Sequence, residues 1–147
     1  MNGGAGVIAA AVSQWDYSYE SAREAARRAG RPLFVDFTGH TCVNCKVNER
    51  NLFDKPAVVA LFQQMQLAKL YTDADRARRQ STPLQQETAP FHRETLARLA
   101  GRGAGTPYYM VLDPESEAIL SRVNGLTNLD AFTAMLQQGL DAFAARR

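Results

Sequence analysis

Cys42 and Cys45 are the residues of this chain whose types and spacing most clearly suggest chemistry. Two residues that lie three positions apart in the first turn of a helix are about 5–6 Å apart, which is within the separation that a disulfide requires. The chain has no other cysteine that could link distant segments, and a bond that closes so short a loop adds little stability. We therefore predict that the pair is reactive rather than structural.

The predicted position of Cys42, at the beginning of a helix, favours its thiolate. The free N–H groups and the positive end of the helix dipole both stabilise a negative charge there. In such motifs the first cysteine has a pKa lowered from about 8.5 to between about 3.5 and 7.5. Cys45, one turn further along, is predicted to be more buried and to attack the mixed disulfide that Cys42 forms. Cys42 is thus the predicted attacking sulfur and Cys45 the resolving one.

Two acidic residues are candidates for proton transfer near this pair. Asp36 stands within the apolar run 33–37, six positions before Cys42, so we expect it beneath the cysteines, where a buried carboxyl can exchange protons with Cys45. Glu49 lies one helical turn beyond Cys45 and can approach the same sulfur. The alternatives are a solvent-facing strand end for Asp36 and an ordinary exposed helix residue for Glu49.

Pro107 and the two histidines of the chain are the remaining residues that could take part in chemistry. Thr106-Pro107 immediately precedes an apolar run, where an X-Pro bond can be cis, although the sequence does not decide the isomer. His40 is close to Cys42 and could support its thiolate, but a solvated loop histidine is the favoured interpretation. His92 is predicted to lie on the surface.

The elements that must position these residues follow from periodicity and from turn residues. Helices are predicted over 18–29, ending at Gly30, and over 42–51, 56–64 with Asp54 as cap, 90–100, and from a cap at Thr127 or Asn128 towards the C-terminus. Strands are predicted over 33–37, 67–71, 108–112 and 119–123, the last two as an antiparallel hairpin. This order predicts an α/β fold, a central mixed sheet with helices on both faces.

Length and composition indicate one globular domain. The chain has 147 residues, 46% of them apolar and 22% charged, with a net charge of +2 and no long basic run, so nucleic-acid binding is not expected. The apolar stretch 3–12 is too short to cross a bilayer, which takes about 20 residues, and no basic residue precedes it as in a signal peptide. We predict a linker or domain edge over 1–14 and one domain over 15–147, with a polar insertion around 72–105.

Several motifs occur here in the order found in thioredoxins: Phe-Val-Asp-Phe-Thr-Gly at 34–39, Cys-Val-Asn-Cys-Lys at 42–46, Thr-Pro at 106–107, and Gly125. The chain therefore resembles the thioredoxin-like superfamily and the thioredoxin fold. Together with the acid at Glu49 and the Pro-Tyr-Tyr run at 107–109, these motifs are most similar to the C-terminal domain of the DsbD family of thiol:disulfide interchange proteins. The resemblance spans about 15–143. It departs from ordinary thioredoxins at Val43-Asn44, where they have Gly-Pro.

The resemblance implies a protein-disulfide reductase that takes electrons from a membrane-embedded thiol pair and passes them to a periplasmic acceptor domain, as in cytochrome c biogenesis. It also implies that Cys42 and Cys45 are the redox pair, that Asp36 and Glu49 are the acidic residues around them, and that Pro107 is a cis-proline facing the disulfide. The implied location is periplasmic, with the cytoplasm still open. We expect a monomer without a cofactor.

Two other functions compete with thiol exchange. His40, Cys42 and Cys45 could bind copper or zinc, but a structural zinc usually takes four ligands and no second cysteine pair is present. The chain could also be a redox-inert interaction module that retains only the fold. A reversible disulfide between the two cysteines distinguishes thiol exchange from both alternatives.

Overall fold

A computed structural model describes residues 14–147 and contains one five-stranded sheet. The linker predicted over 1–14 lies outside the described residues except for Gln14. The strands lie in the order β1-β3-β2-β4-β5, in which β1, β3 and β2 are parallel and β4 and β5 are antiparallel to their neighbours. The elements are β1 (Trp15–Asp16), α2 (Tyr19–Ala29), β2 (Leu33–Thr38), α3 (Val43–Leu52), α4 (Pro56–Phe62), β3 (Gln66–Tyr71), the 3-10 turn η1 (Arg78–Gln80), α5 (Pro83–Ala100), β4 (Tyr108–Leu112), β5 (Ile119–Asn124) and α6 (Leu129–Ala145).

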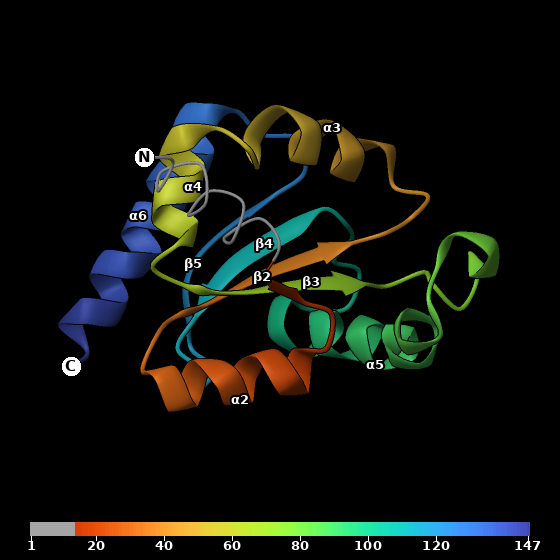
Figure 1. Cartoon of the computed structure of the whole chain (residues 1–147), viewed down its shortest axis with the longest axis horizontal. Helices are drawn as coiled ribbons and strands as arrows, with labels where there is room; N and C mark the ends of the chain where they lie inside the picture. The colour runs from red at the N-terminus through yellow and green to blue at the C-terminus, as the bar shows by residue number, and fades with distance from the viewer. Residues whose placement is uncertain (1–13) are drawn as a thin grey trace, which may run out of the picture.

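Helices cover both faces of the sheet, as predicted. Helices α2 and α5 lie on one face, and α3, α4 and α6 lie on the other (Figure 1). The sequence of β2 explains this arrangement, because alternate side chains of a strand point to opposite faces. Leu33, Val35 and Phe37 pack in the core under α2 and α5, whereas Phe34 packs in the aromatic core under α4 and α6. The mixed α/β architecture is therefore confirmed.

The central position of β2 places the residues that follow it near the middle of one sheet edge. All six residues of β2 are buried, and its neighbours are β3 on one side and β4 on the other. Its last residue, Thr38, is in register with Tyr71, the last residue of parallel β3. The chains that leave these two strands therefore emerge side by side, and α3 begins at this edge (Figure 1).

Two predicted helix starts were wrong. Asp54 does not cap α4, because Lys55 occupies the N-cap position and makes no capping bond with its side chain. Helix α5 begins at Pro83 instead of Pro90, because Thr82 and Gln85 form a reciprocal capping box that satisfies the first backbone N–H groups. Pro90 lies within the helix with its ring exposed. More of the predicted polar insertion is therefore regular structure than the sequence indicated.

The prediction that His92 lies on the surface was also wrong. Its side chain is 1% exposed, beneath α2 and next to β3. Nε2 accepts a hydrogen bond from the Tyr19 N–H at 3.4 Å, so the proton belongs on Nδ1, which lies 3.2 Å from the Tyr71 carbonyl oxygen. Burial lowers the pKa of His92, and the bond to Tyr71 opposes this only in part. A neutral imidazole thus links α5 to α2 and β3.

Candidate functional site

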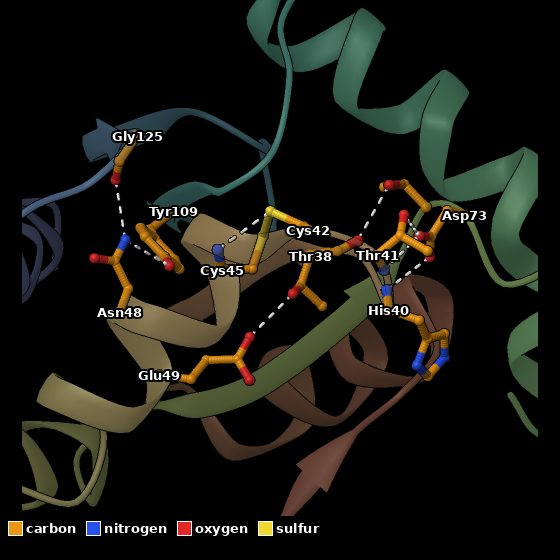
Figure 2. Close-up of a disulfide and its surroundings, with 11 residues drawn as sticks. Thr38, His40, Thr41, Cys42, Cys45, Asn48, Glu49, Asp73, Tyr109 and Gly125 are labelled. Carbon is orange, nitrogen blue, oxygen red and sulfur yellow. Dashed lines mark hydrogen bonds between the residues drawn. A yellow bond between two sulfur atoms is a disulfide. The ribbon is translucent and has the colours of Figure 1, made fainter. Parts of the chain in front are cut away.

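The two cysteines form a disulfide at the beginning of α3. Their Cα atoms are 5.3 Å apart, and Cys42 occupies the N-cap position, where its Sγ accepts a hydrogen bond from the Cys45 N–H at 3.2 Å. Cys42 is partly exposed, whereas Cys45 is completely buried. Cys42 is therefore the more exposed residue of the pair, and its sulfur is contacted by a backbone N–H of the first helical turn (Figure 2).

Asp36 lies in β2 on the sheet face that α3 covers. Its side chain is completely buried, and neither carboxylate oxygen has a hydrogen-bond partner in the described part of the chain. Burial raises the pKa of Asp36 well above its ordinary value, the negative charge of Glu49 raises it further, and the positive charge of Lys69 opposes both. A carboxyl group in such a site is held in its protonated form over a wider pH range than an exposed one.

Glu49 and Lys69 form an ion pair near Asp36, with Lys69 Nζ 3.6 Å from Glu49 Oε1. The other oxygen of Glu49 accepts a hydrogen bond from the Thr38 hydroxyl at 3.0 Å (Figure 2). Lys69 is the register partner of Asp36 on β3, and its ammonium lies 4.9 Å from the Trp15 ring centre. Glu49 and Lys69 both line a cavity of about 380 Å³ beside α3. A partly buried charged pair therefore lies close enough to the buried acid to act on its ionisation.

Asn48 is a site residue that the sequence analysis missed. It is 1% exposed, and its Nδ2 donates hydrogen bonds to the Tyr109 hydroxyl at 3.1 Å and to the Gly125 carbonyl at 3.0 Å. Its Oδ1 accepts a hydrogen bond from the Thr127 N–H at 3.2 Å. Asn48 thus joins α3 to β4 and to the loop between β5 and α6 (Figure 2). Its position one turn after Cys45 was the available signal, but its partners are distant in sequence.

Asp73 was missed as well, and it holds the turn that precedes Cys42. Its carboxylate accepts hydrogen bonds from the His40 N–H at 2.8 Å, the Thr41 N–H at 3.0 Å and the Thr41 hydroxyl at 2.8 Å (Figure 2). A Cβ atom at Gly39 would lie 3.0 Å from Asp73 Oδ2, so a larger residue there would press on this carboxylate. Burial alone would raise the pKa of Asp73, but the bonds from Thr41 and His40 lower it below the ordinary value.

The His40 side chain points away from the disulfide. Its ring stacks on Tyr71 with centres 3.9 Å apart, and Nε2 lies 3.0 Å from Gln85 Oε1. Within residues 14–147, no group of three His, Cys, Asp or Glu side chains is arranged to hold a metal ion. The proposed ligand set of His40, Cys42 and Cys45 is thus not brought together.

Pro107 lies at the same sheet edge as the disulfide. The Thr106-Pro107 peptide bond is cis, and Pro107 directly precedes β4, whose first residue, Tyr108, pairs with Phe37 of β2. The Pro107 carbonyl accepts a hydrogen bond from the Gly125 N–H at 2.9 Å. The segments that carry Pro107, Gly125 and Asn48 are therefore joined by hydrogen bonds.

The fold and the disulfide site together identify the class of protein to which this chain belongs. A central strand, a short turn and a disulfide at the first turn of the next helix are the apparatus of a thiol:disulfide oxidoreductase. Residues 14–114 match the family model described as thioredoxin-like, and the chain belongs to that family.

Two curated relatives are thiol:disulfide interchange proteins. DsbD of Pseudomonas fluorescens is 26% identical over 124 residues, which are 84% of this chain and 19% of the relative. DsbD 2 of Pseudomonas aeruginosa is 36% identical over 53 residues, which are 36% of this chain and 9% of the relative. The chain therefore spans about a fifth or less of the length of the curated relatives it matches. The resemblance to the DsbD family is confirmed for this region.

Solved structures show the same fold. A thioredoxin from Thermus thermophilus superposes with a TM-score of 0.63 at 25% identity, over 91% of this chain and 92% of the other. The oxidised C-terminal domain of DsbD from Neisseria meningitidis gives a TM-score of 0.60 at 16% identity, over 82% and 90%. Among residues 14–147, no helix is both long and apolar enough to cross a membrane.

Proposed function

We propose that this chain is a protein-disulfide reductase that passes electrons through Cys42 and Cys45 to a partner protein. The observation that carries the proposal is the asymmetry of the pair, with Cys42 accessible at the N-cap of α3 and Cys45 fully buried behind it. An accessible, stabilised thiolate next to a shielded thiol suits attack by the first sulfur and resolution by the second.

The exchange has two balanced steps. The Cys42 thiolate attacks one sulfur of the partner disulfide, which forms a mixed disulfide and releases the partner's other sulfur as a thiolate that takes up a proton. The Cys45 thiolate then attacks Cys42, which forms the Cys42–Cys45 disulfide and releases the second partner thiol. Two electrons pass to the partner, whose disulfide is reduced while this chain is oxidised. The N–H of Cys45 that contacts Cys42 Sγ is the group that stabilises the first thiolate.

Asp36 is proposed to act as the proton acceptor for Cys45 in the second step. Support comes from its burial on the sheet face beneath α3 and from its carboxylate, which no other group engages within the described residues. Glu49 and Lys69, whose charges act on Asp36, are proposed to set its proton affinity. Pro107 is proposed to face the disulfide and to align the partner's chain.

The direction and the partners of this chain are proposed from its similarity to DsbD proteins. On that basis, the donor is a membrane-embedded thiol pair and the acceptor is a periplasmic disulfide domain, with a role in cytochrome c biogenesis. The proposed location is the periplasm. The proposed unit is a monomeric domain over 15–147, whose polar insertion around 72–105 adjusts the choice of partner.

A redox titration with mass counting of trapped thiols tests the proposal. A single two-thiol transition near or below about −200 mV is expected of a reducing exchange protein. A transition near about −120 mV would indicate an oxidant, and the lack of any transition would refute thiol exchange. Cys45→Ser should accumulate the mixed disulfide with a peptide disulfide, whereas the matched Cys42→Ser variant should form none.

A further inference from the structure

The segment 73–82 begins at the sheet edge where the turn before Cys42 also lies, and Asp73 joins the two by hydrogen bonds. The segment follows β3, whose end is in register with the end of β2. Helix α3, whose N-cap is Cys42, begins at the same sheet edge (Figure 1). Asp73 contacts the backbone N–H groups of His40 and Thr41, and Gln85, in the first turn of α5, contacts the His40 ring. The segment is thus attached to the turn that leads into Cys42.

This segment has a defined conformation held by its own hydrogen bonds. The Ser81 hydroxyl donates to the carbonyls of Ala74 and Ala77, at 2.9 Å in each case. Arg93 of α5 forms two bonds to the Asp75 carboxylate, at 2.7 and 3.0 Å, and a third to the Thr72 carbonyl at 2.7 Å. The segment therefore has a fixed conformation and is joined through Asp73 to the turn that precedes Cys42.

The charges of this surface are unbalanced. Its two carboxylates are both engaged within the fold, Asp73 with the turn before Cys42 and Asp75 with Arg93. Arg76, Arg78 and Arg79 are exposed, and none forms an ion pair in the part of the chain that the structure describes. Three positive charges thus face solvent on the segment that holds the turn before Cys42.

We propose that Arg76, Arg78 and Arg79, the basic surface, dock a partner protein whose disulfide lies in an acidic face. The inference rests on the proposed exchange function and adds the chemistry of the partner. Charge complementarity steers encounter and suppresses partners of like charge, and its effect on association is larger than its effect on the chemical step. Because the arginines are exposed, salt should screen the preference.

The test compares two synthetic disulfide peptides of equal length, one with glutamates and one with lysines around its cystine. The full chain is reduced, and its second-order exchange rate with each peptide is measured at low and high salt. We expect the acidic peptide to react about tenfold faster near 20 mM salt and the difference to vanish near 500 mM. The Arg78→Glu/Arg79→Glu variant should lose or invert this preference.

A matched control changes the net charge by the same amount elsewhere. Lys55 follows α3 and Arg122 lies on the edge strand β5, and both are exposed, so Lys55→Glu/Arg122→Glu should keep most of the preference. The neutral variant Arg78→Gln/Arg79→Gln, checked for folding by circular dichroism, should abolish the preference without inverting it. Equal exchange rates with both peptides would refute the docking role of the basic surface. An equal loss of the preference for the acidic peptide in the two charge-reversed variants would refute it as well. No exchange with either peptide would instead overturn the proposed function.

Discussion

Replacing Asp36 by asparagine should stabilise the oxidised protein, and the gain should depend on pH. Asp36 is completely buried and its carboxylate has no hydrogen-bond partner within residues 14–147, so ionisation in the folded state is unfavourable. The pKa of Asp36 is raised in the fold, chiefly by burial. Protonated Asp36 therefore favours the folded state fully below the pKa that Asp36 has in the unfolded chain. This stabilisation is lost as pH rises from there towards the higher pKa that Asp36 has in the folded protein. Asp36→Asn removes that loss.

The size of the stability gain of Asp36→Asn follows from the linkage between proton binding and folding. An unfolded aspartate titrates near pH 3.9, and each pH unit between the unfolded and folded pKa is worth about 1.4 kcal/mol. The stability gain of Asp36→Asn should therefore be near zero at about pH 4 and grow by about 1.4 kcal/mol per pH unit until the folded pKa is reached. At pH 7 this stability gain can therefore be at most about 4 kcal/mol.

Urea unfolding of the oxidised protein at a series of pH values measures this gain. The matched control is Asp54→Asn, because Asp54 is an exposed aspartate at the other end of α3, and its gain should stay close to zero throughout. A gain for Asp36→Asn that did not vary between about pH 4 and pH 7 would refute the argument that ionisation of a buried carboxyl is the cause. The same variant should slow release of the partner from the mixed disulfide if Asp36 takes the proton of Cys45.

Three further predictions concern residues that hold the site. Asn48→Ala should lower the free energy of unfolding by about 1–3 kcal/mol in urea titrations, because it removes a partner of the buried Tyr109 hydroxyl and of the half-buried Gly125 carbonyl. A loss below about 0.5 kcal/mol would show that this link is dispensable. Gly139→Ala should cost about 1–3 kcal/mol by thermal unfolding, since a Cβ there would lie 2.6 Å from Val111 Cβ where α6 packs on β4, and an unchanged stability would contradict this close contact. Asp73→Asn should destabilise the fold by about 1–2 kcal/mol near pH 7. Because the folded pKa of Asp73 is lowered, that deficit should shrink as pH falls below the ordinary value of 3.8, and a deficit independent of pH would count against the carboxylate.

Local patterns predicted much of the fold correctly. Examples are the glycine that ends α2, the apolar run of β2 and the asparagine cap of α6. Each of these signals affects only residues close to it in the sequence, so its effect can be predicted from the sequence. The start of α5 was misjudged for a local reason too, because the Thr82 and Gln85 capping box was overlooked in favour of Pro90. The burial of His92 was not predictable in that way, since its partners are Tyr19 and Tyr71 on other elements.

The sequence by itself determined the pair of cysteines, their place at the first turn of a helix and the buried strand that precedes them, because spacing and periodicity are properties of neighbouring residues. Only the tertiary structure decided which distant groups meet around that pair. Asp73 reaches the turn before Cys42, and Asn48 reaches Gly125, across 33 and 77 positions respectively. Such contacts depend on how β2, β3 and β4 align in one sheet and on how the helices pack against it, and sheet register is set by the whole core.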